Sequence, residues 1–463
     1  MLAVLVTGLF MALLDVTIVN VAVPTIGRSL HASGSGLQLV VAGYIVSYAM
    51  LLITGARLGD MRGHRNVYLV GVTTFTLASL SCGLAPTTGV LIGARLVQGA
   101  GAALMVPQIL SVIQHRFPGA ARARALSIYA AALASGAVVG QVLGGILVSA
   151  DLLGASWRPV FLVNVPVGLA VALLVPRLVP ADRVAGGRRL DLPGLATAWS
   201  AVLLIVLPLV LGQEQGWPAW TWASLGGGVA LLGAFLRIER SVAARGDHPL
   251  LNLRVFRAPG MSAGLAALTV GMTAYGGLLF SLALHLQVGL GDSALRAGLT
   301  FAPAAAAFGA TGYWWRRLPS GVHHALTPVG FLVATLAYLG LATDLHAGGR
   351  GGPWLELVLI AYGVGMGAAF SPLLTQALVH VPGSEAADAS GLLTTTIQLS
   401  QVIGVAVFGG LFLSLATHQQ AHASATAVST VLLWLAALTV LGVASATVLA
   451  RTVLSAARRV APR

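Results

Sequence analysis

Leu2–Val23 reads LAVLVTGLFMALLDVTIVNVAV, an apolar run in which Asp15 is the single charged side chain. A helix of this length crosses a hydrocarbon core about 30 Å thick. The run resembles a secretory signal in its position, but no basic segment precedes it and a carboxylate stands in its centre. We therefore interpret it as the first membrane-spanning helix of an integral membrane protein.

The rest of the chain repeats this pattern. Of its 463 residues, 57% are hydrophobic and 8% are charged, whereas roughly 25% of the residues of soluble domains are charged. Apolar runs long enough to span a bilayer recur about 14 times. The sequence predicts an all-α polytopic membrane protein with 14 transmembrane helices.

The basic residues predict the orientation of these helices. All 26 are Arg, and the absence of Lys excludes a GK[ST] phosphate loop, so we do not expect this chain alone to pump with ATP. In one alternating set of loops lie 21 of the 26, and the positive-inside bias assigns that set, with both termini, to the cytoplasm. The same bias explains the net charge of +13 without nucleic-acid binding.

Two long polar connections, Pro180–Pro193 and Arg237–Pro259, flank a pair of helices. The chain is thereby divided into six, two and six helices, and two sets of six are typical of transporters built from internal repeats. We expect an N-terminal bundle, an accessory pair with its linkers, a C-terminal bundle and a basic cytoplasmic tail, at residues 1–180, 181–258, 259–450 and 451–463.

Two charged side chains lie deep inside the expected spans. Among 13 acidic residues only Asp15 is deep, and Arg95 is the one Arg within a span. A carboxylate at bilayer depth costs several kcal/mol unless it is paired or protonated, so such a residue indicates function; the alternative is a polar contact between helices. The helical rise puts both in one layer, about 10–12 Å below the outer surface. We predict a proton-coupling pair, in direct contact or joined through Gln98 and water.

The connection between the second and third spans, residues 59–65, reads GDMRGHR. Gly59 and Gly63 permit a tight turn. Asp60 beside Arg62 and Arg65 can form an ionic latch that opens when the helices rock. The alternative is a solvated basic loop.

The fifth span carries small residues at four-residue spacing, which lets two helix backbones approach closely. They are Ala132, Gly136, Gly140 and Gly144, with Gly145 adjacent. Gln141, in the same stretch, is either pocket-lining or a packing hydrogen-bond group.

Aromatic and amide side chains within spans of both halves are candidates for substrate binding, because aromatic faces suit lipophilic cations. The alternative is simple packing between helices. The candidates are Tyr44, Tyr48, Gln98, Tyr275 and Gln398.

Together these residues resemble the major facilitator superfamily, in particular its 14-helix branch of drug:proton antiporters. Leu14–Pro24 is similar to that branch's first-helix motif, Leu58–Arg65 to the loop motif, Arg95–Gly101 to the fourth-helix motif, and Gly136–Gly145 to the antiporter motif. Departures occur at Ala56, Met61 and His64 in the loop motif and at Gln141, where the family usually has Pro and hence a bend. The first three weaken the latch argument.

The resemblance implies two six-helix bundles around a central cavity, with the central pair inserted between them. It also implies proton-driven export of small lipophilic, often cationic compounds from a bacterial cell, across its inner membrane. The Arg-only, Ala- and Gly-rich composition is typical of a GC-rich source. An antibiotic producer exporting its own product fits these features.

Two other classes of protein remain open at this stage. A proton-linked importer or facilitator of a small metabolite has the same fold, but it needs several polar groups in its cavity. A membrane-embedded enzyme needs a second catalytic group near Asp15, which the sequence does not provide. We expect a monomer that contacts lipid, protons and a small substrate, without a cofactor. We expect no metal site, because His418 and His422 have no acidic or Cys partner nearby.

Overall fold

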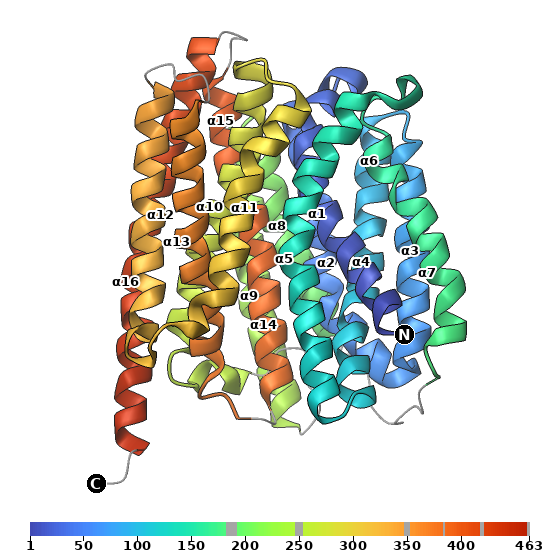
Figure 1. Cartoon of the computed structure of the whole chain (residues 1–463), viewed down its shortest axis with the longest axis vertical. Helices are drawn as coiled ribbons and strands as arrows, with labels where there is room; N and C mark the ends of the chain where they lie inside the picture. The colour runs from blue at the N-terminus through green and yellow to red at the C-terminus, as the bar shows by residue number, and fades with distance from the viewer. Residues whose placement is uncertain (182–191, 246–252, 347–351, 383–384, 417–420, 461–463) are drawn as a thin grey trace. The chain divides into compact units, whose positions relative to one another are not determined.

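The computed structural model describes residues 1–181, 192–245, 253–346, 352–382, 385–416 and 421–460. Within these ranges every regular element is helical and no strand occurs, which confirms the all-α prediction (Figure 1). Twelve segments are helical, long and apolar enough to cross a membrane. Two further helices of that length, α5 (Gly119–Ala150) and α11 (Ala294–Trp314), bring the number to the 14 that the sequence predicts.

The chain forms two compact units. The first comprises Met1–Leu250 with Ser293–Leu299, and the second comprises Leu251–Asp292 with Thr300–Arg463. The four-part division at residues 180, 258 and 450 stays a prediction.

In the first unit, the six-helix part packs α2 and α3 on α4, α1 on α5, and α3 on α7. Side-chain caps explain two of the helix starts, since Ser33 and Thr87 accept hydrogen bonds from backbone N–H groups in the first turns of α2 and α4. The helices other than α5 are α1 (Leu2–Leu30), α2 (Gly34–Arg62), α3 (His64–Gly83) and α4 (Thr88–Arg116). The sixth is a single span, Pro159–Leu178, broken into α6 (Pro159–Leu162) and α7 (Asn164–Leu178).

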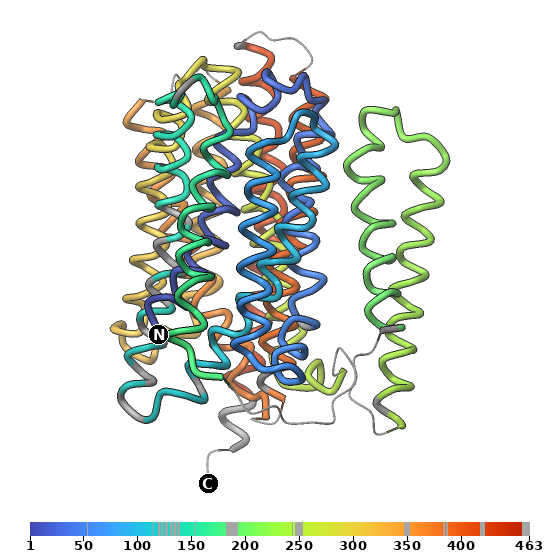
Figure 2. The backbone as a smooth tube through the Cα atoms, turned by 90° about the vertical axis from the view of Figure 1, so that its right-hand side faces the viewer, coloured from blue at the N-terminus to red at the C-terminus, as the bar shows by residue number. Residues whose placement is uncertain are grey.

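The first unit also contains α8 (Leu192–Leu211) and α9 (Ala219–Ala244), which pack against each other as a helical hairpin (Figure 2). Only 28% and 17% of their most apolar windows are buried, compared with 83% for α2. The hairpin therefore has little protein around it, and α8 makes its contact with the bundle at α2.

The second unit packs α10 (Met261–Leu284) against α14 (Ala386–Gly404) and α16 (Ala421–Val460), and packs α12 (His323–His346) against α13 (Pro353–Leu378) and α16. One π-turn extends α10 over His285–Gly289, and another joins α14 to α15 (Gly410–Leu415) over Val405–Gly409. The basic residues Arg451, Arg458 and Arg459 of the predicted tail continue α16, whereas residues 461–463 lie outside the described ranges.

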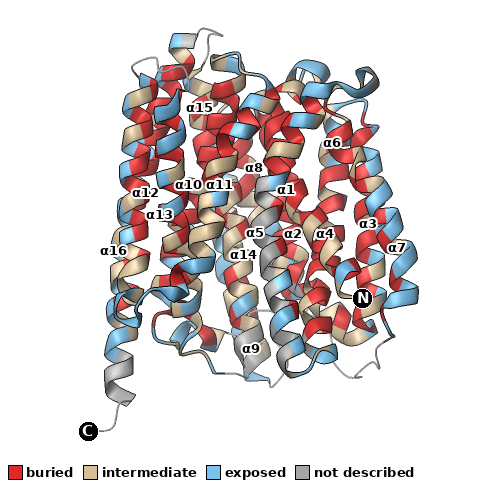
Figure 3. Cartoon of the chain, in the orientation of Figure 1, coloured by how far each residue is buried: buried red, intermediate tan, exposed pale blue. Residues whose placement is uncertain are grey.

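Large apolar side chains on the outer helix faces are exposed, as Figure 3 shows by its exposed strips along the helices. Leu77 on α3, Leu173 on α7 and Leu336 on α12 are each more than half exposed. Leucine is no less apolar than a lipid tail, so such faces suit a bilayer and do not suit water.

Candidate functional site

Asp15 lies in the middle of α1 and is completely buried. Its Oδ2 accepts a hydrogen bond from Arg95 Nη1, and its Oδ1 accepts one from Gln98 Nε2 at 2.8 Å and one from Asn164 Nδ2 at 3.1 Å. The predicted pair of charges is thus in direct contact. Helices α1, α4 and α7 meet at this carboxylate, and its charge is both paired and hydrogen-bonded, as a buried charge requires.

The Arg95 guanidinium is fixed from several sides and is 1% exposed. Its Nε donates to the Val40 carbonyl of α2 at 3.0 Å, and its Nη1 donates to Gln98 Oε1 at 2.7 Å. Its Cζ lies 4.5 Å from the centre of the Tyr44 ring and 5.6 Å from that of Phe161. A planar cation over aromatic rings is held by cation–π attraction as well as by hydrogen bonds.

The Gln98 amide has a defined orientation, because both of its ends are bonded. Its Nε2 donates to Asp15 Oδ1 and to Ser79 Oγ, each at 2.8 Å. Its Oε1 accepts from Arg95 and, at 3.7 Å, from the Cys82 thiol. Ser79 in turn donates to the Phe75 carbonyl at 2.8 Å, so the network extends from the ion pair into α3.

Two candidate substrate-binding tyrosines lie beside this network. Tyr44 is buried, donates to the Ala12 carbonyl at 3.1 Å, and stacks on Tyr48 with ring centres 6.1 Å apart. Tyr44 and Gln98 therefore belong to the ion-pair site in this structure. Tyr275 on α10 and the buried Gln398 on α14 belong to the second unit. For all five candidates, a role in substrate binding stays a prediction.

Asn164 is a site residue that was not predicted from the sequence. A break between α6 and α7 at Val163 makes Asn164 the first residue of α7 and directs its amide to Asp15. One signal was available, since Asn164 lies seven residues inside the expected span Trp157–Leu178, among apolar neighbours. A buried amide in a span needs a polar partner.

The glycine stripe of α5 packs against α1 on both sides of Asp15. A Cβ added at Gly136 meets Leu13, one at Gly140 overlaps Thr17, and one at Gly144 meets Ile18. The stripe therefore sets the distance between these two backbones. Gly145 instead faces Leu295, in the short α11 segment of the first unit. Gln141 is buried, and its Oε1 has no hydrogen-bond partner among the described residues.

Residues 59–65 comprise the last turn of α2, Gly63 between the two helices, and the start of α3. Gly63, with φ 88°, ends α2 and precedes α3 in a backbone conformation that favours glycine. Gly59 lies against Gln108 and His64. His64 Nδ1 donates to Gln108 Oε1 at 2.8 Å, since an amide oxygen only accepts, and His64 Nε2 is 3.8 Å from Asp60 Oδ1.

The side chain beside Asp60 is thus the histidine that departs from the loop motif. Arg62 is exposed and Arg65 is partly buried. The latch role of the loop stays a prediction.

Within the described ranges no three metal-binding side chains gather at one place, and His418 lies outside those ranges.

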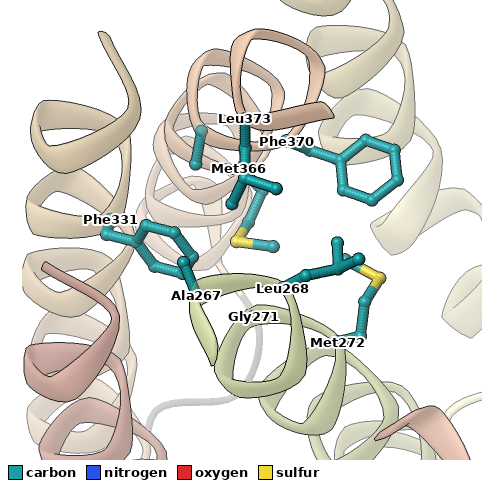
Figure 4. A pocket seen from close by; sticks show the side chains of 9 residues that line it. Ala267, Leu268, Gly271, Met272, Phe331, Met366, Phe370 and Leu373 are labelled. Atoms are coloured by element: carbon teal, nitrogen blue, oxygen red, sulfur yellow. The ribbon is translucent and has the colours of Figure 1, made fainter. Parts of the chain in front are cut away.

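The second unit has an apolar pocket between α10, α12 and α13, where Phe331, Met366 and Met272 face one another (Figure 4). Its lining has no charged or hydrogen-bonding side chain.

The family model of the Major Facilitator Superfamily matches residues 5–405. The chain belongs to this superfamily. Solved structures of the same fold include a bacterial homologue of the human lysosomal transporter Spinster, inward-facing and unoccupied. It has a TM-score of 0.70 and 18% identity, over 98% of this chain and 97% of that one. An auto-inhibited POT family peptide transporter has a TM-score of 0.71 and 15% identity, over 97% and 96% of the two chains.

Several relatives in sequence are named as a transporter, an export protein or a multidrug resistance protein. The chain is 38% identical to the probable actinorhodin transporter of Streptomyces coelicolor, over 88% of this chain and 71% of that protein. It is 36% identical to the cephamycin export protein CmcT of Amycolatopsis lactamdurans, over 87% and 82%. It is 34% identical to the putative multidrug resistance protein MdtD of Salmonella typhimurium, over 87% and 84%.

Proposed function

We propose that this protein is a proton-coupled antiporter that exports small lipophilic compounds, among them antibiotics, by alternating access. The observation that carries the proposal is the completely buried Asp15, bonded to Arg95, Gln98 and Asn164 at the meeting point of three helices. A group that binds and releases protons inside a membrane transporter has to be a deep ionisable side chain, and Asp15 is such a group.

The contacts of Asp15 give a mechanism for exchange. Protonation of the carboxylate removes its charge and weakens its attraction to Arg95, so the bonds that join α1, α4 and α7 loosen. Release of the proton restores an anion that favours a cationic substrate and renews the pair. Direct competition of proton and substrate for one site gives the same net exchange.

The relatives support export over import. Two bear the names of antibiotic transporters, for actinorhodin and for cephamycin, and a third that of a putative multidrug resistance protein. The near-absence of charge inside the spans also agrees with an apolar cargo. A sugar or acid carrier needs more polar groups than this chain places at depth.

The same proposal covers location and assembly. We place the protein in the bacterial inner membrane as a monomer. The arginine distribution among the loops supports a cytoplasmic position for both termini. The latch of Asp60 with its basic neighbours, and the lining role of Tyr44, Tyr48, Gln98, Tyr275 and Gln398, belong to this proposal.

A susceptibility panel tests export directly. A bacterium lacking its own pumps expresses the wild-type protein or Asp15→Asn, and growth is measured against actinorhodin, a cephamycin and several lipophilic cationic dyes. Wild type should raise the inhibitory concentration of at least one compound, while Asp15→Asn at equal membrane level should not. Increased sensitivity or increased uptake with wild type points to the importer and contradicts the proposal.

A further inference from the structure

The backbone of the turn between α8 and α9 is tied by hydrogen bonds within the turn. Gly212–Trp217 is closed by a bond from the Trp217 N–H to the Gly212 carbonyl at 2.8 Å, and the N–H of Gln215 donates to the Leu211 carbonyl at 3.3 Å. Gly216 and Trp217 both have positive φ, at 68° and 57°. The Trp217 ring also lies where a Cβ on Gly212 would come within 3.0 Å of it. The turn therefore presents its side chains from a fixed backbone.

From this turn Glu214 reaches the first turn of α2. Its Oε1 accepts a hydrogen bond from the Ser35 N–H at 2.6 Å, and its Oε2 accepts one from the Ser35 hydroxyl at 2.7 Å. An ionised carboxylate only accepts, so the Ser35 proton points to Glu214, and the Ser33 hydroxyl, 3.1 Å away, donates to Ser35 Oγ. The bond to Ser35 N–H also places a negative charge at a helix N-terminus, where the dipole favours it.

The helix that Glu214 contacts, α2, also contacts Arg95 of α4. Val40, five residues beyond Ser35 and about 7.5 Å along the helix, accepts from Arg95 Nε at 3.0 Å. Tyr44, one turn further, lies over the guanidinium. A shift of α2 along or about its axis therefore moves both groups relative to the Asp15–Arg95 pair.

The two helices of the hairpin are the least buried of the candidate spans among the described residues, and α8 contacts the six-helix part at α2. We propose that Glu214 is a positioning residue: through its two bonds to Ser35, the α8–α9 hairpin holds the first turn of α2 and keeps Val40 and Tyr44 against Arg95. This assignment of a role to the inserted pair rests on the proposed function of the Asp15 site.

The test uses the full-length protein in proteoliposomes. Hydrogen exchange of amides 34–44 is measured in wild type, in Glu214→Ala and in Glu356→Gln. The last is a matched control, because Glu356 is an exposed acid in the first turn of α13 in the other unit. Glu214→Ala should speed exchange about two- to tenfold, as the loss of charge-assisted bonds at a partly exposed site implies, and Glu356→Gln should leave exchange unchanged.

A cross-link then separates positioning from mere stability. Ser35→Cys combined with Glu214→Cys is treated with a short bis-methanethiosulfonate reagent; the single native Cys82 is buried and stays in place. Before treatment the double variant should behave like Glu214→Ala. After treatment, protection of amides 34–44, the rate of substrate-driven proton release and its pH profile should all return towards wild type.

Two results would overturn the proposed role of Glu214, and a third would contradict the proposed function of the protein. Wild-type exchange rates in Glu214→Ala overturn the clamp. Restored protection without restored proton release overturns its effect on the Asp15 site. Wild-type protein that releases no protons on adding any exported compound contradicts the proposed function instead, and the exchange data alone then decide whether the clamp exists.

Discussion

Asn164 Nδ2 lies 3.1 Å from Asp15 Oδ1 and donates to it, which attaches the first turn of α7 to the centre of α1. The same oxygen accepts from Gln98 of α4. Asp15 Oδ1 is thus hydrogen-bonded to two neighbouring helices, while Oδ2 is paired with Arg95. A change in the charge of Asp15 therefore alters its hydrogen bonds to both α4 and α7.

Replacing Asn164 by Ala should destabilise the protein by about 1.5–3 kcal/mol, the range for a buried hydrogen bond to a charged group. Asn164→Asp should be worse, because it puts a second acid against Asp15 in a dry site. Thermal unfolding in detergent, followed by size-exclusion chromatography, measures both. Equal melting temperatures for wild type and Asn164→Ala would contradict a contribution of this size from the Asn164–Asp15 hydrogen bond to stability.

Gly140→Ala should impair transport, because the new Cβ overlaps Thr17 and approaches the Leu14 carbonyl to 2.8 Å, on both sides of Asp15. Overpacking of this kind typically costs about 1–3 kcal/mol. Gly93→Ala on α4 is the matched control, since nothing lies within 4 Å of its new Cβ and helix propensity improves by up to about 1 kcal/mol. Efflux of a fluorescent dye is the assay. A Gly93→Ala defect equal to that of Gly140→Ala argues against the packing explanation.

Tyr44→Phe and Tyr44→Ala should separate two roles of this side chain. Phe keeps the ring 4.5 Å from Arg95 and loses only the hydroxyl bond to Ala12, so dye efflux should fall less than about fivefold, the effect of a neutral hydrogen bond. Ala removes the cation–π contact as well and should abolish most efflux. The substrate profile should be measured for both variants. If Ala at Tyr44, Tyr48 and Tyr275 leaves the profile unchanged, these residues do not bind the substrate.

The fold could be predicted from the sequence because its determinants are local. Every apolar run forms a helix by itself, and a membrane leaves the backbone no alternative. The pairing of Asp15 with Arg95 was predictable for a related reason: two charges that are rare at depth are stable only together. Helical rise alone placed them in one layer.

The rest of the site depends on contacts between helices, which no single run of sequence contains. Asn164 reaches Asp15 because the chain breaks at Val163, and apolar residues surround that break. Glu214 reads in sequence as an ordinary loop acid, and its contact with Ser35 spans 179 positions. In the sequence His64 was only a departure from a motif. Its position between Asp60 and Gln108 depends on the packing of the first turn of α3 against α4.

The orientation of the helices is open to a direct test. Reporter fusions after Leu178 and after Ala450 should both report the cytoplasm, because both positions adjoin loops of the arginine-rich set. A fusion in the turn after Gly212 should report the opposite side and serves as the control. A periplasmic signal after Leu178 or Ala450 contradicts the assigned topology.

Asp15→Asn should abolish proton coupling while leaving the protein folded and inserted. The amide keeps the shape of the side chain, and its oxygen still accepts from Gln98, Asn164 or Arg95, but it cannot take up or release a proton. The charge of Arg95 then lacks its partner, so some loss of stability is expected, and Arg95→Gln in the same background should recover part of it by removing the unpaired buried charge.

Substrate-driven proton release from proteoliposomes measures the coupling itself. Wild type should release protons when an exported compound is added, Asp15→Asn should release none, and Asp15→Glu should keep a reduced rate, because it keeps the ionisable group at a displaced position. Glu356→Gln, which removes an exposed acid far along the chain, should match wild type. An Asn variant that is folded and still exchanges protons at the wild-type rate shows that another group carries the proton.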